Sequence, residues 1–293
     1  MLDIKRIGVF LKNTHIDDAV LAFAAHIGRD PARRLFIAHV SNPDDPETPP
    51  TPTAEAFDQT TRARLPDIAA TSLETAVLKG NQIEQILRAA RDQDLDLMVL
   101  GRRLPSSQIG LGAKIARIVR KSPCSVLIVP DLCQPHFDRI LAGVDCSDHS
   151  RDALEAAVQI ARTAPGQRQV TAVNVRNIPH GYDVAGITFV EAAERQRQRG
   201  MENLRQFIDK TDTDGVSVEP LVLLSEDPAL AMTHAAMAKK MDIVIVGSRG
   251  SSGTAAALMG TTSERLLMTC ATPTLIIKRK GETLSLLEAL FGM

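Results

Sequence analysis

The sequence of 293 residues predicts an α/β protein made of two tandem domains of one kind, each with a doubly wound parallel sheet. Three observations support this fold class: the motifs repeat in order, the predicted strands are continuous apolar runs, and helical patterns alternate with them. Continuous β-branched runs are typical of parallel strands buried on both faces, with helices as the crossovers. Because one domain usually takes about 150 residues, the length also fits two domains.

The repeat consists of five pairs of matching segments. One pair is Leu-Asp-Leu-Met-Val-Leu-Gly at residues 95–101 and Met-Asp-Ile-Val-Ile-Val-Gly at residues 241–247. In chain order the segments are residues 6–11, 19–25, 35–40, 95–101 and 122–129 in the first half, and 139–144, 153–160, 170–175, 241–247 and 271–277 in the second. A repeat of this length indicates duplicated domains rather than a solenoid.

The boundary between the domains is expected near residues 130–136. The first domain then covers residues 1–132, the second covers residues 136–280, and a C-terminal tail covers residues 281–293. Apolar side chains at helical spacing in the tail predict a helix, either packed on its own domain or exposed for docking. These side chains are Leu284, Leu287, Leu290 and Phe291.

The halves differ after their second strands. In the first half, dense prolines over residues 41–53 predict an extended loop, because proline disrupts a helix interior. In the second half, residues 189–210 predict a long helix with one apolar stripe. The stripe is formed by Val190, Ala193, Met201, Leu204 and Ile208.

Composition restricts the class of function. The formal net charge of −1 provides no field that would attract nucleic acid or an anionic membrane, and aromatic residues for base stacking are only 3% of the chain. No apolar run approaches the ~20 residues that span a bilayer. The first residues do not resemble a signal peptide, so a cytoplasmic location is expected.

The four cysteines fit a reducing compartment, since they show no CxxC spacing. Cys133 and His136 have a metal-like spacing, but a linker thiol and buried small apolar residues explain the cysteines more simply. No metal site is therefore predicted.

The most informative segment is residues 247–265. Gly247 ends a predicted strand, Gly250 allows the backbone to turn without a side chain, and Gly260 comes just before a helix expected over residues 264–269. Free amides at a helix start, flanked by the Thr261 and Thr262 hydroxyls, form an anion site suited to phosphates. Thr or Ser before Glu is also an ordinary helix cap, and a glycine-rich loop alone does not separate the two interpretations.

The spacing Gly-x2-Gly-x9-Gly-Thr after a strand resembles the nucleotide motif of the universal stress protein family, and the resemblance covers nearly the whole chain, twice. It implies a tandem member with Rossmann-like domains of the adenine-nucleotide alpha hydrolase type, and ATP as the cofactor, with or without Mg²⁺. It implies that Asp145 holds the adenosine and that Val175 packs on the adenine. It further implies that ribose and phosphates are held by Gly247, Ser248, Gly250, Gly260, Thr261 and Thr262.

The first half departs from this motif. Gly101 is present, but Leu104 stands where the second glycine belongs, only seven residues separate Leu104 from Gly112, and Lys12 replaces the Asp after the first strand. We therefore expect the first domain not to bind nucleotide in the same way. The alternative is that Lys12, Arg102 and Arg103 form a different anion site.

The sequence argues against a vigorous enzyme. There is no GxxxxGK[ST] loop, and no Ser/His/Asp or HExxH arrangement that would predict hydrolysis. His149 and Arg249 could reach a phosphate, although such residues are more often solvated loop positions. No catalytic residue is predicted.

These observations predict an ATP-binding stress or signalling protein whose nucleotide state alters its shape or partners. A slow ATPase or nucleotidyl-transferring enzyme is one alternative, and an interaction scaffold without ligand is another. The closing strands at residues 126–129 and 274–277 are short and apolar, which favours strand-to-strand pairing. The family resemblance implies pairing through this strand, and we expect it between the halves, with two chains associating further as a homodimer. The expected partners are an adenine nucleotide, a second copy and an unidentified protein, with no nucleic acid and no membrane.

Overall fold

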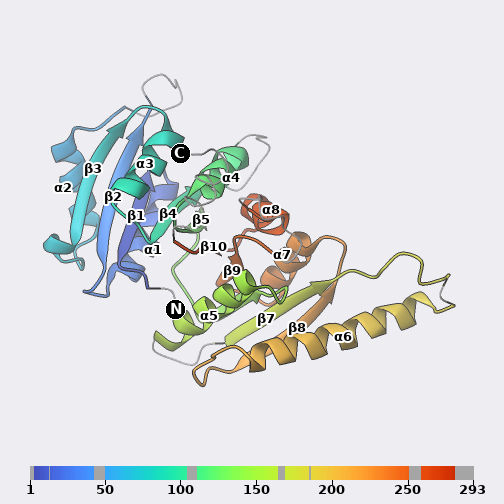
Figure 1. Cartoon of the computed structure of the whole chain (residues 1–293). Helices are drawn as coiled ribbons and strands as arrows, with labels where there is room; N and C mark the ends of the chain where they lie inside the picture. The colour runs from blue at the N-terminus through green and yellow to red at the C-terminus, as the bar shows by residue number, and fades with distance from the viewer. Residues whose placement is uncertain are drawn as a thin grey trace, which may run out of the picture. The chain divides into compact units, whose positions relative to one another are not determined.

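The computed structural model describes residues 3–12, 14–42, 50–103, 111–163, 169–184, 186–250 and 259–280. The chain divides into two compact units (Figure 1). The N-terminal unit consists of Asp3–Pro135 together with the segment that starts at Lys278, and the C-terminal unit consists of His136–Ile277. The Leu104 position and the predicted tail helix over residues 281–293 lie outside the described residues.

In its described part, the N-terminal unit has five parallel strands in the order β3-β2-β1-β4-β5. The strands are β1 (Arg6–Leu11), β2 (Arg34–Ser41), β3 (Leu73–Lys79), β4 (Leu97–Arg102) and β5 (Ser125–Pro130). The helices are α1 (Ile16–Gly28), α2 (Ala54–Arg64), α3 (Gln82–Asp92) and α4 (Leu111–Lys121), with a 3₁₀ turn at η1 (Ala70–Ser72).

The C-terminal unit repeats this plan, with the described strands in the order β8-β7-β6-β9-β10. Its strands are β6 (Arg139–Gly143), β7 (Gln169–Arg176), β8 (Val218–Leu224), β9 (Ile243–Gly247) and β10 (Thr274–Ile277). Its helices are α5 (Asp148–Thr163), α6 (Phe189–Asp209), α7 (Pro228–Ala238) and α8 (Thr261–Thr269). Chain order reverses on either side of β6, and this is where ligands bind in open α/β sheets.

The predicted fold class is confirmed. Every residue of β5, β9 and β10 is buried, which explains why these strands are continuous apolar runs instead of alternating ones. The edge strands β3 and β8 are mostly half-buried, because each has a strand partner on one side only within the described sheet of its unit. The core of each unit therefore lies on its central strands.

The helix α6 agrees with its predicted stripe only in part. Ala193 and Leu204 are buried as expected, but Val190 is 74% exposed, and Gly200 and Phe207 are also buried. Gly200 determines which face of α6 packs on the sheet, because a Cβ atom at this position would lie only 2.9 Å from the Val222 side chain on β8. The absent side chain allows α6 to lie close along β7 and β8, as Figure 1 shows, and turns the buried stripe toward that contact.

One further element differs from the sequence prediction. The helix α8 begins at Thr261 rather than at residue 264, because Gly260 with an extended backbone serves as its N-cap. The helix α2 begins where the predicted proline-rich loop ends, with Thr53 as its N-cap.

Candidate functional site

A cavity of about 440 Å³ opens at the carboxyl ends of β6, β7 and β9 in the C-terminal unit. This volume lies within the range of small-molecule sites. Seven of the eight predicted site residues line it: Asp145, Val175, Gly247, Gly250, Gly260, Thr261 and Thr262. Residues that are far apart in the sequence thus meet at the edge of the sheet where a doubly wound fold is expected to bind its ligand.

Asp145 lies two residues beyond the end of β6 and lines the cavity. Its Oδ1 accepts hydrogen bonds from the Ser147 amide at 3.0 Å and the Ser147 hydroxyl at 2.6 Å. We call the segment from Gly247 to Gly260 the glycine loop. The Asp145 Oδ2 lies so close to this segment that a Cβ atom added to Gly250 would be 2.6 Å from that oxygen. Burial raises the pKa of the neighbouring Cys146 thiol, and the Asp145 carboxylate raises it further. The Asp145 carboxylate therefore presents an acceptor for hydroxyl or amino groups at the cavity wall.

Gly247 and Gly250 are both required by close contacts. A Cβ atom at Gly247 would lie 2.6 Å from the carbonyl oxygen of His149, at the start of α5. The glycine at this position therefore fits β9 against α5, and Gly250 fits the loop against Asp145.

Gly260 is different, because neither its backbone conformation nor a close contact requires a glycine. Its φ of −74° and ψ of 146° are extended values that any residue adopts. The nearest atoms to an added Cβ would be backbone atoms of Arg249 and Gly250 at 3.6 Å, an ordinary contact. A side chain at Gly260 would occupy space at the cavity wall without straining the chain.

Ser248 is the predicted site residue that the structure does not place on the cavity wall. It is 3% exposed, and its amide donates a hydrogen bond to the Ile277 carbonyl at 2.9 Å. Its own carbonyl accepts a hydrogen bond from the Gly260 amide at 2.8 Å. The Ser248 backbone thus connects the start of the glycine loop to β10 through Ile277 and to the end of the loop through Gly260.

The first turn of α8 forms the polar wall of the cavity. Its N-cap, Gly260, has no side chain that could cap the helix, so the first amides of the helix have no partner from that position. Thr261 and Thr262 line the cavity, while the Ser263 hydroxyl donates to the Gly247 carbonyl at 2.7 Å and fixes the helix to β9. Amides at the positive end of the helix dipole suit an anion such as a phosphate.

The opposite wall is apolar, and sequence reasoning found only Val175 on it. Val173 on β7 and two residues of α7, Pro228 and Met232, also line the cavity. Asp227 caps α7 by accepting from the Leu230 amide at 3.2 Å, and it pairs with Arg265 of α8 at 2.5 Å. The Asp-Pro pair is a helix-start signal that could have located α7, but nothing local indicates which of its side chains face the cavity.

His149 and Arg249 are the charged residues that the sequence offers as phosphate ligands. Arg249 lines the cavity, whereas His149 is not among the lining residues and contributes its backbone to the Gly247 contact. Arg249 is therefore the cation that the fold brings to this site.

The N-terminal unit uses the same positions differently. Gly101 keeps the packing role of Gly247, because a Cβ atom there would lie 2.6 Å from the Ile16 side chain. The Lys12 amide donates to the Asp17 carboxylate at 3.2 Å, and Arg102 is buried. The helix α4 begins at Leu111, so Gly112 lies inside its first turn, unlike Gly260, which precedes α8. Lys12, Arg102 and Arg103 therefore stand at the carboxyl ends of β1 and β4, where the C-terminal unit has Asp145, Ser248 and Arg249.

Within the ranges that the structure describes, no group of three or more His, Cys, Asp or Glu side chains is placed to hold a metal ion. Among the same residues, no helix has the length and apolar character needed to cross a membrane.

Comparison with known proteins agrees with this architecture. The model of the universal stress protein family matches residues 3–130 and again residues 136–278. The chain is 27% identical over 148 residues to universal stress protein YxiE of Bacillus subtilis, and 29% identical over 142 residues to a universal stress protein of Thermus aquaticus. Each alignment covers 48% of this chain and 99% of the relative.

A solved structure resembles the whole chain. A universal stress protein from Archaeoglobus fulgidus aligns with a TM-score of 0.62 at 17% identity, over 94% of this chain and 97% of its own. The chain belongs to the universal stress protein family and carries two of its domains in tandem.

Proposed function

We propose that this protein is an ATP-binding regulator of a stress response or signalling pathway, with the nucleotide held by the C-terminal unit. One observation carries the proposal: a single cavity combines the Asp145 carboxylate, the glycine loop, the uncapped start of α8 and an apolar wall. These surfaces match the parts of a nucleotide in their chemistry, namely hydroxyl donors, an anionic phosphate chain and a flat apolar base.

In this proposal, different residues of the cavity contact different parts of the nucleotide. Asp145 accepts hydrogen bonds from the ribose or the adenine amino group, and Val175 packs with Met232 against the base. The amides and hydroxyls of Thr261 and Thr262 hold the phosphates, with Arg249 as the nearby cation. Mg²⁺ is expected to accompany the phosphates.

A slow ATPase or nucleotidyl-transferring enzyme is the second candidate function, and a ligand-independent scaffold is the third. A turnover assay with purified protein, ATP and Mg²⁺ separates the enzyme from the binding protein. Mass spectrometry of nucleotide that remains bound through purification separates the binding protein from the scaffold. We further propose a cytoplasmic homodimer with an unidentified protein partner, which light scattering tests at the level of the dimer.

The substitution Gly260→Val tests the site directly. Because the backbone at Gly260 is extended and an added Cβ has room, the variant is expected to fold and to melt within a few degrees of wild type. Its branched side chain fills the phosphate side of the cavity, so ATP affinity is expected to fall about 100-fold or more, as for a clash of ~3 kcal/mol. Calorimetric titration with ATP measures the affinity.

Gly260→Ala is the matched control, since its single methyl group keeps an ordinary contact distance and should weaken ATP binding much less. Asp145→Asn adds an independent lesion at another residue of the cavity wall. If folded Gly260→Val protein binds ATP as tightly as wild type, the assignment of the site is wrong.

A further inference from the structure

The helices α3 and α7 occupy equivalent positions in the two units. Each has 11 residues and begins after a capping side chain, Asn81 for α3 and Asp227 for α7. Asn81 is as far from Asp227 along the chain as Gly101 is from Gly247, the glycines of the repeat. The two helices can therefore be compared residue by residue, each within its own unit (Figure 1).

The exposed faces of these helices differ in charge. On α3 every exposed residue is charged: Glu84, Arg88, Arg91 and Asp92. On α7 the same four positions are exposed, the helix has no Asp, Glu, Lys or Arg, and these positions carry Leu230, His234, Met237 and Ala238. Leu230 is 46% exposed and Met237 is 62% exposed. Because a solvent-facing helix surface normally carries charges, an apolar one indicates contact with a partner.

Opposite charges stand at the two ends of this apolar face. Glu226 precedes the N-cap of α7, and Lys240 follows its C-cap, Lys239. The Glu226 side chain is 74% exposed, and its Oε1 lies 3.9 Å from the His180 Nε2. Lys240 is exposed and forms no ion pair with the residues that the structure describes. The face therefore ends in an acidic group on one side and a basic group on the other, both accessible to a second molecule.

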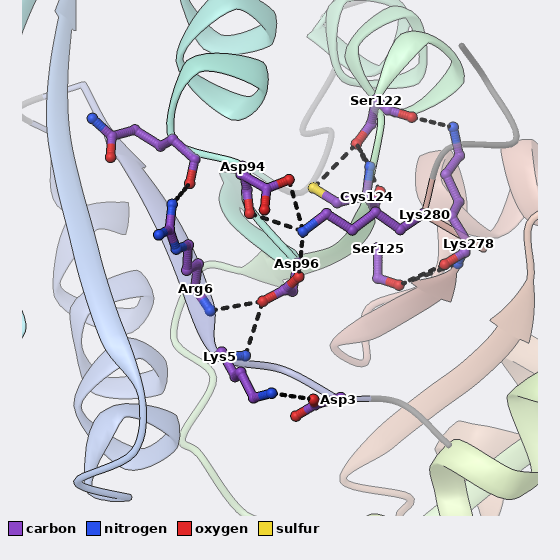
Figure 2. Close-up of polar contacts among 11 residues, drawn as sticks. Asp3, Lys5, Arg6, Asp94, Asp96, Ser122, Cys124, Ser125, Lys278 and Lys280 are labelled. Atoms are coloured by element: carbon purple, nitrogen blue, oxygen red, sulfur yellow. Dashed lines mark hydrogen bonds and ion pairs between the residues drawn. The ribbon is translucent and has the colours of Figure 1, made fainter. Parts of the chain in front are cut away.

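The N-terminal unit neutralises its own charge at the position of Lys240. Asp94 stands there, and both residues have a positive φ, 48° for Asp94 and 52° for Lys240. The Lys280 Nζ donates to the Asp94 carboxylate at 2.9 Å and to the Asp94 carbonyl at 3.0 Å (Figure 2). Lys280 belongs to the same compact unit as Asp94. The charge after α3 is therefore paired within its unit, whereas the charge after α7 is left for another molecule.

The face of α7 is complementary to itself when it is reversed. In an antiparallel pair of α7 helices, Leu230 lies against Met237 and Glu226 lies against Lys240, and the two-fold symmetry forms each contact twice. His234 then lies near the symmetry axis. A helix of 11 residues is about 16 Å long, so both ends stay in contact when the helices cross at a small angle. Apolar contacts then form the centre of the interface and charge pairs its rim, as is usual.

We propose that the exposed face of α7 binds the same face of a second copy of the chain, with the two helices antiparallel. This inference rests on the proposed homodimer and assigns its surface. It does not depend on ATP, because neither Leu230 nor Met237 lines the nucleotide cavity. The apolar centre is small, so the association belongs to the weak class, with a Kd on the order of 10 μM.

Sedimentation equilibrium of the full chain without nucleotide tests this surface. Up to about 200 μM, wild type is expected to shift from the 31.7 kDa chain to a dimer. Leu230→Arg and Met237→Glu each place a charge in the apolar centre and should weaken the association about 30-fold or more. Both variants should fold, since the equivalent residues of α3 are Glu84 and Arg91. The matched control is Val190→Arg on α6, which alters an exposed apolar residue outside this face and should change nothing.

A mixture of the two variants tests the antiparallel arrangement. In the mixed dimer the introduced guanidinium faces the introduced carboxylate, while the other half of the interface keeps Leu230 against Met237. The mixture should therefore associate about tenfold more tightly than either variant alone. A parallel pair of helices, or a partner other than a second copy, gives no such recovery.

The charges at the ends of the face are tested by reversal. Lys240→Glu brings its new carboxylate against Glu226 of the second copy and should weaken the association about fivefold. Adding Glu226→Lys to the same chain reverses both charges and restores their complementarity. The doubly substituted chain should therefore associate within about twofold of wild type.

The outcomes separate this inference from the proposed function. If wild type stays at the mass of one chain throughout, the homodimer and this inference are both overturned, and calorimetry with ATP still decides the nucleotide site. If wild type and Leu230→Arg dimerise equally well, the homodimer forms through another surface and this inference is overturned. If both variants dissociate and their mixture does not recover, an antiparallel second copy is the wrong occupant of this face.

Discussion

His39 and Asn174 show at the scale of single residues how the two units have diverged. Each is the sixth residue of an eight-residue strand, His39 on β2 and Asn174 on β7. The Asn174 side chain donates a hydrogen bond to the Val144 carbonyl at 2.7 Å, whereas the His39 Nε2 is buried and has no hydrogen-bond partner among the described residues. Burial lowers the pKa of His39 from its ordinary value of 6.5, and the nearby Asp17 carboxylate offsets only part of this shift.

This shift makes the N-terminal unit sensitive to acid. The unfolded chain binds a proton at His39 more readily than the folded chain, so the stabilising contribution is complete above pH 6.5 and is lost as the pH falls below that value. In His39→Asn, the melting temperature should fall less than in wild type between pH 7.5 and pH 5.5. Thermal unfolding followed by circular dichroism across this range measures the difference. Parallel curves for the two proteins would refute it.

At the scale of elements, α2 and α6 follow the second strand of their units, and each begins with a Thr as its N-cap. The two caps differ in the number of hydrogen bonds they make. On α6, the Thr188 hydroxyl accepts from the Glu191 amide at 3.2 Å, and the Glu191 carboxylate accepts from the Thr188 amide at 2.7 Å, a complete capping box. The hydrogen bond from the Thr188 backbone is the main cause that lowers the pKa of Glu191. On α2, Thr53 accepts only from the Ala56 amide, at 3.2 Å.

The caps can be compared by one pair of substitutions. Thr188→Ala is expected to lower the free energy of unfolding by about 1 kcal/mol, and by more than Thr53→Ala, because the Thr188 hydroxyl both accepts from the Glu191 amide and donates to the Glu191 carboxylate, whereas the Thr53 hydroxyl makes one hydrogen bond within the described residues. Urea unfolding at neutral pH measures both variants against wild type. The expectation also implies that the Thr188→Ala cost shrinks at low pH, where the Glu191 carboxylate is protonated. Equal effects of the two substitutions would show that the capping box adds nothing.

At the scale of the whole molecule, the duplication has produced unlike units on one fold. The strand order is the same in both, yet Lys12 occupies the place of Asp145 and the buried Arg102 occupies the place of Ser248. A lysine in place of an acceptor removes the hydrogen bonds that a ribose or an amino group would make. The glycine that precedes α8 also has no counterpart in Gly112, which lies inside α4.

Calorimetric titration of the full chain is therefore expected to give close to one ATP per chain. ATP affinity should fall about 100-fold or more in Gly260→Val and should be unchanged in Lys12→Ala, because the N-terminal unit lacks the acceptor and each lost polar contact weakens binding by about 1–3 kcal/mol. Titration with inorganic phosphate tests the alternative that Lys12, Arg102 and Arg103 bind a different anion. Two equivalent ATP sites per chain would contradict the asymmetry of the units.

The amino-acid sequence by itself determined the fold class, the duplication and seven of the residues that line the cavity. It could do so because these features depend on local patterns: apolar runs define buried strands, and the glycine spacing with an Asp after a strand defines what meets at the carboxyl edge of a parallel sheet. The close contacts of Gly247 with His149 and of Gly250 with Asp145 explain why glycine is needed at those two positions.

Only the tertiary structure decided that Ser248 faces β10 instead of the cavity, that Pro228 and Met232 complete the apolar wall, and that the Lys278 ammonium group lies at the C-terminal end of α4. The physical reason is common to all three. Which way a side chain or a peptide group points depends on packing partners that lie far away in the sequence, such as Ile277 for Ser248 and Ser122 for Lys278. The local sequence pattern does not indicate those partners. It is compatible with a side chain or peptide group that points to either side of its segment, and the choice is made only when the sheet and its helices have assembled.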